Sequence, residues 1–350
     1  MRGASTIIGL ATVSATLFVA GQRVAEAARV TSAVRLNAIR HAGVWTSTNI
    51  HARDLATGPG GRDAFPPHAT VHCTFVPRPH GRGSTRKFDC ALPSGRVLKV
   101  RYGDDNGEVY AQVAATRLLW ALGFDANRMY PVVVVCRGCS ADPFKDRTAS
   151  GARERTFDPA TIEVKTDGRT IETKPDEGWS WHELSNVDEA AGGAPAPQRD
   201  ALTLLAVLMQ HSSNKAINQR IVCLDQPACT HTRMFITDVG KTFGAASLLN
   251  DDAVASVNFK EWSGTPVWKG PSGCVGNLAM SLTGTLRNPR ISEAGRKFLS
   301  ELLAQLSDQQ LRDLFTVARF TARDRTATVE DWVAAFNRKR QEIAVRRCSD

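Results

Sequence analysis

The chain has 350 residues, of which 42% are hydrophobic and 23% are charged, and its formal net charge is +9. A basic protein could bind anionic surfaces, phosphates or nucleic acid. Its Lys and Arg residues are scattered, however, and no basic run with interleaved aromatic residues occurs, which argues against a nucleic-acid partner. The positive excess is therefore interpreted as solvated surface.

The first 27 residues have the pattern of a secretory signal. Arg2 gives the positive start, residues 5–20 are apolar, and Ala25-Glu26-Ala27 is a small-x-small cleavage site. We therefore expect an exported protein, periplasmic or secreted, without a membrane span after cleavage; an uncleaved anchor is the alternative. The remainder, about 320 residues, is long enough for one large bilobal domain or two small ones.

The first half of the remaining chain is predicted to be rich in strands. Residues 28–65 form an irregular lead-in, and apolar alternation then predicts strands over 70–76, 87–92 and 96–102. From Gly107 the apolar period becomes helical, which predicts a helix over 109–122 that stops at Gly123.

Further strands are predicted before the middle of the chain. Residues 132–136 are a fully apolar strand candidate, followed by a polar stretch to Arg155. Residues 161–165 and 170–174 bracket Asp167-Gly168, a dipeptide typical of a hairpin turn.

The second half is predicted to be mostly helical. An apolar helix over 199–210 runs into a turn at His211, and short strands over 221–224 and 234–237 pair beside it. Later helices begin at residues that can cap them, namely near Ser292, at Ser307 and at Thr328. The expected division is a signal (1–27), a lead-in (28–65), a β-rich N-lobe with an insert (66–190), an Ala/Gly/Pro linker (191–198) and a helical C-lobe (199–350).

Eight cysteines, all beyond the signal, are typical of an oxidising compartment. The candidate disulfide pairs are Cys73 with Cys90, which flank a predicted hairpin, and Cys223 with Cys229, which flank a turn. Cys136 and Cys139, the single CxxC, are further disulfide candidates without an assigned partner. A zinc site usually needs a second pair at ligand spacing, and the sequence has none. The connectivity, including that of Cys274 and Cys348, stays open.

Several residues have the spacing of a phosphoryl-transfer site. Such a site needs a strand lysine for the phosphates, a helix carboxylate that orients the lysine, and an amide and an aspartate for the metal ion. Lys99 lies in the middle of a predicted strand, so it is the candidate lysine, although an edge-strand lysine is the alternative.

Residues 211–218 match the pattern His-x-Asp-x-Lys-x-x-Asn, with His211, Lys215 and Asn218 in register. Asn218 and Asp238, in Asp238-Val239-Gly240, are the candidate metal ligands, and Asp238 also faces the phosphates. The alternative interpretation is a capped helix end followed by an ordinary turn.

On these residues the chain resembles the protein-kinase-like superfold, nearest to its secretory-pathway branch of Golgi casein kinase and four-jointed type. Residues 111–124 are similar to that branch's helix ending in Leu-Gly-Phe, and the resemblance covers residues 70–245. The chain also resembles bacterial exported proteins of unassigned function that share Leu-Leu-Trp-Ala-Leu-Gly-Phe. The resemblance implies an α+β, bilobal fold, with a β-rich N-lobe containing one main helix and a mostly helical C-lobe. It also implies ATP or another nucleotide bound with Mg²⁺ or Mn²⁺.

Two positions depart from that branch. Gln112 stands where the helix glutamate is expected, and Glu108, one turn earlier, could replace it. Ser213 stands where the acidic base is expected, and a hydroxyl cannot accept a proton at neutral pH. The phosphate loop is also weak, since residues 81–84 (Gly-Arg-Gly-Ser) are its only candidate.

The resulting hypothesis is an exported kinase-like protein with a nucleotide and metal cleft and weak or degenerate phosphotransferase activity. The alternative is an inactive pseudokinase or scaffold that binds an unidentified protein or envelope partner. Two weaker possibilities are a Ser/His/Asp hydrolase, for which no GxSxG is present, and a carbohydrate groove lined by tryptophans: Trp179, Trp181, Trp262 and Trp268. For these tryptophans a core position is favoured.

Overall fold

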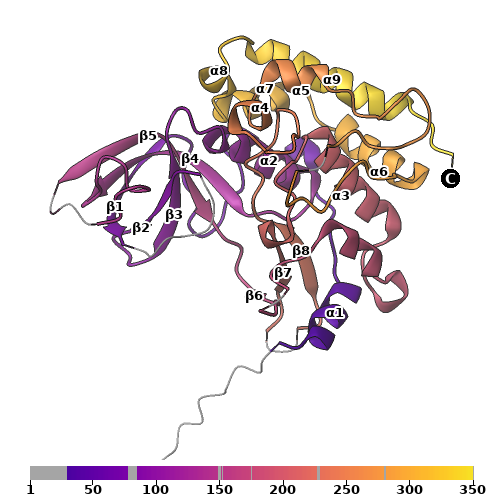
Figure 1. Cartoon of the computed structure of the whole chain (residues 1–350), viewed down its shortest axis with the longest axis horizontal. Coiled ribbons are helices and arrows are strands. Elements are labelled where there is room, and N and C mark those ends of the chain that lie inside the picture. Colours follow the sequence, from indigo (N-terminus) through magenta and orange to yellow (C-terminus); the bar gives the residue numbers. More distant parts are fainter. Residues whose placement is uncertain are drawn as a thin grey trace, which may run out of the picture.

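The computed structural model describes residues 30–77, 85–148, 151, 153–174, 176–226, 229–279 and 281–349. Within these ranges the chain is a mixed α+β structure, with a strand barrel at one end and most of the helices at the other (Figure 1). The predicted signal at 1–27 and the glycine-bearing loop at 81–84 lie outside the described residues. In the described part, every helix is too short or too polar to cross a membrane.

The strands of the first half close into a barrel. Their order around the barrel is β1 (Ala69–Val76), β2 (Lys87–Ala91), β3 (Val97–Tyr102), β5 (Glu154–Val164) and β4 (Arg128–Arg137). Paired strands run antiparallel except β1 and β4, which are parallel. In β1 the alternate residues Val71, Cys73 and Phe75 are buried, which is the period that predicted this strand.

Helix α2 (Glu108–Leu122) lies between the barrel and the helical part of the molecule. It contacts β3, β4 and β5 on one side and α7 and α8 on the other. Gly123 ends the helix with a φ of 89°, and a Cβ added there would lie 2.1 Å from Thr46 O, so no other residue fits. The predicted helix and its stop are confirmed.

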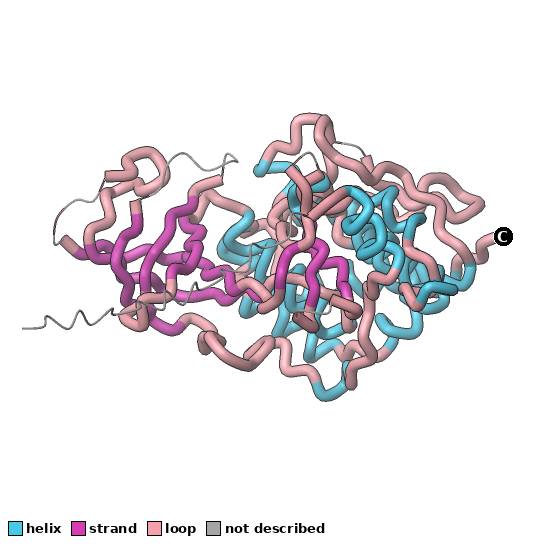
Figure 2. The backbone as a smooth tube through the Cα atoms, turned by 90° about the horizontal axis from the view of Figure 1, so that it is seen from below, coloured by secondary structure: helices cyan, strands magenta, loops and turns pink. Residues whose placement is uncertain are grey.

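A second, three-stranded sheet has the order β6 (Arg169–Thr170), β7 (Gln219–Cys223) and β8 (Thr232–Ile236). Figure 2 shows its strands apart from those of the barrel and next to the helices. The hairpin predicted around Asp167-Gly168 is wrong, because β5 pairs with β3 on one edge and β4 on the other, and β6 pairs with β7. Both edges of β5 are occupied, so its continuation must leave the barrel.

The described lead-in is less irregular than the sequence predicted. It contains α1 (Ser32–Arg40), capped by Thr31, and the 3-10 turn η1 (Ile50–Ala52). Further 3-10 turns precede the helical part and follow α3: η2 (Trp181–Asn186), η3 (Glu189–Ala191) and η4 (Ala216–Asn218).

The remaining helices are α3 (Ala196–Leu208), α4 (Asp252–Ala255), α5 (Phe259–Gly264), α6 (Glu293–Ala304), α7 (Asp308–Val317), α8 (Phe320–Arg323) and α9 (Val329–Val345). Ser292 caps α6, and capping boxes start α7 at Ser307 and α9 at Thr328, as predicted. Helix α3 begins within the stretch 191–198, so part of that predicted linker is helical.

The tryptophans singled out in the sequence belong to the core. Trp179, Trp181, Trp262 and Trp268 are each at most 5% exposed, and Trp262 stacks on Trp332 with ring centroids 5.4 Å apart. Covered rings cannot form a carbohydrate platform, so that alternative is wrong and the core interpretation is confirmed.

All eight cysteines lie within the described residues, and all are disulfide-bonded. The structure forms the two candidate pairs, Cys73–Cys90 and Cys223–Cys229, and it joins the two cysteines of the CxxC, Cys136 and Cys139, to each other. The fourth bond joins Cys274 to Cys348 across 74 residues of chain, a separation from which no sequence pattern suggests a pair.

Candidate functional site

A cavity of about 700 Å³, here called the cleft, lies between the barrel and the turn that follows α3. The sequence-predicted residues that line it are Lys99, Glu108, Ser213, Lys215, Asn218 and Asp238. Gln112 is fully buried behind this lining, and its side-chain amide contacts Asp238. The structure therefore brings together predicted residues that come from the barrel, α2 and the second half of the chain.

Arg101, a residue the sequence analysis missed, is the central cation of the cleft. Its side chain is 4% exposed and lies among three carboxylates. The nearest oxygens are Oε2 of Glu163 at 2.8 Å, Oε2 of Glu108 at 3.6 Å and Oδ2 of Asp238 at 3.8 Å. Arg101 thereby links the barrel, helix α2 and the Asp238 turn.

Lys99 makes a different contact from the one that the family pattern implies. Its Nζ lies 3.0 Å from Oε2 of Glu163, the residue opposite it in the register of β3 and β5. The contact between the strand cation and the helix carboxylate is instead made by Arg101 and Glu108, two residues further along β3 and on the same face. Lys99 is 31% exposed in its side chain, so its ammonium reaches the open cleft.

Glu163 is held ionised by its cationic neighbours. Burial alone acts to raise the pKa of this carboxyl, but the charges of Arg101 and Lys99 outweigh it and lower the pKa to about 2. Asn127 Nδ2 donates to the second carboxylate oxygen at 2.8 Å. Glu163 therefore fixes both basic residues of β3.

Asp238 is oriented by hydrogen bonds from two elements. Gln112 Nε2 and the backbone N–H of Gly240 each donate to its Oδ1 at 3.2 Å. Burial acts to raise the pKa of Asp238, but Arg101 and the Gly240 hydrogen bond outweigh it, so the pKa lies below its ordinary value. A Cβ on Gly240 would lie 2.5 Å from Cγ of Glu108, so glycine allows the turn to lie directly on α2.

Asn218 is connected to Asp238 by a backbone hydrogen bond. The N–H of Asp238 donates to the Asn218 carbonyl at 3.2 Å. The side-chain NH₂ group of Asn218 donates to Ser213 O at 2.7 Å and to Ser213 Oγ at 3.0 Å. The side-chain oxygen of Asn218, Oδ1, is therefore the atom that a metal ion would meet. A carboxylate and an amide oxygen are hard ligands that fit Mg²⁺ or Mn²⁺.

The two oxygens would not complete a metal site alone. Among the described residues, this cleft contains no group of three His, Cys, Asp or Glu side chains that converge on one point. Mg²⁺ usually keeps water or phosphate oxygens in its coordination shell, and such ligands would have to supply the rest.

Among the predicted functional residues of the turn at 211–218, one is fully buried and three line the cleft. His211 is fully buried, and burial lowers its pKa to about 4, so the imidazole is uncharged at neutral pH. Ser213, Lys215 and Asn218 line the cleft. The turn therefore presents a hydroxyl, an ammonium and an amide, but no carboxylate, to a ligand.

Cationic side chains outnumber acidic ones in the described lining of the cleft. Seven lysines and arginines line it: Lys87, Lys99, Arg101, Lys165, Lys215, Arg220 and Lys241. Five acids line it: Glu108, Glu163, Glu172, Glu177 and Asp238. The excess favours an anionic ligand.

The cleft residues that the sequence analysis did not propose are identified only by contacts between strands and helices. Arg101 shares a face with Lys99, which alternation could have shown, whereas Glu163 is placed by its register. Lys241 Nζ lies 2.5 Å from Oδ1 of Asp252, eleven residues along the chain, and 4.0 Å from Oε1 of Glu108. No local sequence motif connects these three residues.

No protein-family model matches the chain, and no curated protein matches it. Among solved structures, the chain is similar to CtkA, a proinflammatory kinase of Helicobacter pylori, with a TM-score of 0.40 and 9% identity over 80% of this chain and 95% of that one. It is also similar to the Golgi casein kinase with Mn/ADP bound, with a TM-score of 0.34 and 12% identity over 79% of this chain and 72% of that one.

A second structure of the Golgi casein kinase gives the same TM-score, 0.34, and the same coverage, 79% and 72%, at 10% identity. These three structures are of kinases. Likenesses this weak carry no argument about activity, and the residues of the cleft must support any functional conclusion by their own geometry.

Proposed function

We propose that this chain is a bilobal kinase-like protein whose cleft binds ATP or a related nucleotide together with Mg²⁺ or Mn²⁺. One observation carries the proposal. Asp238 and Asn218 lie side by side on one wall of the cleft, and the wall formed by β3 presents Lys99 and Arg101. Oxygen ligands for a metal ion and a lysine for the phosphates thus line one cavity.

The charges of the cleft suit a nucleotide with a bound metal ion. Such an ion would bridge phosphate oxygens and neutralise their charge. Lys99, with its exposed ammonium, is the proposed phosphate contact, and Arg101 holds Asp238 and Glu108 in place. Glu108 therefore takes the role of the helix carboxylate, and Gln112 serves Asp238 as a hydrogen-bond donor.

Phosphoryl transfer is proposed to be weak, because the turn lacks a base. Ser213 Oγ already accepts a hydrogen bond from Asn218, and a hydroxyl cannot take a proton at neutral pH. A positioned general base is worth about 10²- to 10⁴-fold in rate. The same observation favours the second candidate, an inactive protein that uses the cleft only for binding.

The proposal predicts that ATP with Mn²⁺ or Mg²⁺ raises the melting temperature of the purified protein. A ligand present at 100 times its Kd stabilises the folded state by about 2.7 kcal/mol, which corresponds to a rise of several degrees for a chain of this size. The measurement is a thermal-shift titration. ATP without a divalent ion, and the ion without ATP, should each give a smaller rise; no rise with any nucleotide would show that the cleft is not a nucleotide site.

Ser213→Asp is predicted to raise ATP turnover at least 10²-fold, because the new carboxylate can accept the hydrogen bond that Asn218 donates and also act as a base. Release of inorganic phosphate from ATP measures it, with water as the acceptor. Ser213→Asn is the matched control, since it has the same shape but cannot accept a proton. If both variants bind ATP and neither turns it over, the phosphotransferase is excluded and the binding protein remains.

We also propose that the protein is exported and acts in the periplasm or outside the cell. The disulfides within the described residues support this, because such bonds persist in oxidising compartments. Cleavage after Ala27 should leave a mature chain that begins at Ala28, which the intact mass of the exported protein tests.

A further inference from the structure

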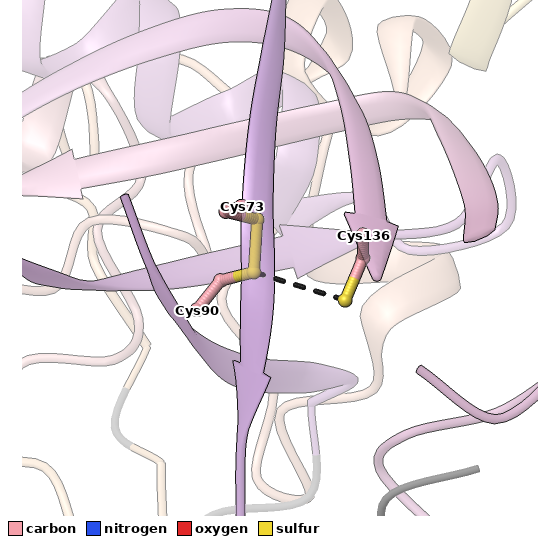
Figure 3. A group of neighbouring side chains, drawn as sticks. All are labelled: Cys73, Cys90 and Cys136. Atoms are coloured by element: carbon pink, nitrogen blue, oxygen red, sulfur yellow. Dashed lines mark hydrogen bonds between the residues drawn. A yellow bond between two sulfur atoms is a disulfide. The ribbon is translucent and has the colours of Figure 1, made fainter. Parts of the chain in front are cut away.

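Two disulfides lie against each other inside the barrel. Figure 3 shows the Cys73–Cys90 bond beside Cys136, whose own bond is to Cys139. The Sγ atoms of Cys90 and Cys136 are 3.7 Å apart, and the sulfurs of Cys73, Cys90 and Cys136 all lie within 4.8 Å of one another. Four sulfur atoms are therefore gathered at one place.

We propose that, when these two disulfides are reduced, Cys73, Cys90, Cys136 and Cys139 together bind one Zn²⁺. In a tetrahedral zinc site with Zn–S bonds of about 2.3 Å, neighbouring sulfurs are about 3.8 Å apart. The distance between the sulfurs of Cys90 and Cys136, 3.7 Å, is already close to this value, and the Cys73 sulfur lies within 4.8 Å of both. The Cα atoms of the two bonded pairs are 5.6 and 5.7 Å apart, which lets side-chain rotation separate the sulfurs without moving the strands.

The strands supply the second ligand pair that the sequence lacks. Cys136 and Cys139 form the single CxxC, and Gly138, with a φ of 80°, closes the turn between them. Cys73 lies directly opposite Cys136 in the parallel pairing of β1 and β4, and Cys90 comes from β2 on the other side of β1. Barrel closure thus assembles a four-cysteine set from three strands and the turn that follows β4.

The surroundings of the sulfurs fit a closed structural site. Cys136 and Cys139 are fully buried, and Cys73 and Cys90 are 6% and 1% exposed, so water has little access to a fifth ligand position.

The chemistry requires a reductant and releases protons. Two molecules of a dithiol give two electrons and two protons each, so the two disulfides become four thiols and the dithiols become two disulfides. Zn²⁺ binding then displaces one proton from each thiol, and four Zn–S bonds form. The metal would then link β1, β2 and β4, whereas the disulfides link only β1 to β2.

The test uses a full-length variant that keeps only these four cysteines, made by Cys→Ser substitution at the other four: Cys223, Cys229, Cys274 and Cys348. The complementary variant keeps those four and replaces the proposed ligands. Each is reduced with dithiothreitol, freed of metal and titrated with Co²⁺, then with Zn²⁺. The first variant is expected to bind one Co²⁺ per chain with the absorption bands of tetrahedral thiolate coordination, and Zn²⁺ should displace it. The complementary variant should show neither.

A second measurement does not depend on how the variants fold. The reduced wild-type chain is alkylated with iodoacetamide with and without Zn²⁺, and peptide mass spectrometry reports each cysteine. Zn²⁺ should protect the four barrel cysteines and leave the other four labelled. Equal labelling with and without zinc, or equal cobalt binding by the two variants, would overturn the proposal.

Discussion

Asp238→Asn is expected to abolish the stabilisation by ATP and Mn²⁺. The substitution keeps the shape of the side chain but removes the negative charge that a divalent ion needs beside the neutral amide of Asn218. The rise in melting temperature seen for the wild type with ATP and Mn²⁺ should fall to that seen with ATP alone. The measurement is the same thermal-shift titration, run on both proteins side by side.

Asp251→Asn is the matched control for this experiment. Asp251 is exposed and caps the short helix α4, and asparagine caps a helix equally well, so the variant loses one charge but no structure. Its response to ATP and Mn²⁺ should equal that of the wild type. A wild-type response in Asp238→Asn would show that the metal ion is held elsewhere.

Arg101→Met is expected to destabilise the fold by about 3–5 kcal/mol, the usual cost of removing one member of a buried ion pair. The variant leaves Glu163 and Glu108, each with a side chain at most 7% exposed, without their central cation. Since whole domains are stable by only about 5–15 kcal/mol, the loss should be visible as a large fall in the urea midpoint.

Lys99→Met is the control for Arg101→Met, because Lys99 lies on the same strand and contacts the same acid. Its side chain is 31% exposed and makes one ion pair, so we expect a loss of only about 1 kcal/mol or less. It should, however, weaken binding of ATP, which Arg101 supports only through Asp238 and Glu108. If the two substitutions destabilise equally, Arg101 is not the central cation.

The role of Glu163 can be checked through pH. Its pKa is lowered from the ordinary 4.5 to about 2, so its ion pairs stabilise the fold fully above pH 4.5 and lose this contribution as the pH falls toward 2. The difference in unfolding free energy between the wild type and Glu163→Gln, on the order of 3 kcal/mol at neutral pH, should therefore shrink across that window.

The residues of the turn at 211–218 and Lys99 on β3 could be predicted from the sequence, but the residues that they contact could not. His211, Lys215 and Asn218 are related by spacing within one turn, and Asp238 follows a short strand that pairs with its neighbour in the chain. Lys99 lines the cleft, but its partner was expected on α2 and lies on β5. Strand register connects residues 64 positions apart, and no local pattern encodes it.

The sequence by itself determined the elements whose stabilising contacts are local. Helix α2 ends at Gly123 because of that residue's own backbone, α7 and α9 begin at capping boxes that join residues three positions apart, and Cys223–Cys229 closes a short loop. These features depend on atoms a few residues apart, so spacing and residue type are enough to predict them.

Tertiary structure alone decided which charged and sulfur-bearing side chains meet. Closure of the barrel occupies both edges of β5 and sends β6 to the second sheet, places Glu163 against Arg101, and brings four cysteines from three strands and a turn into contact. Each of these outcomes depends on how strands distant in sequence align, which is set by the packing of the whole barrel rather than by any one segment.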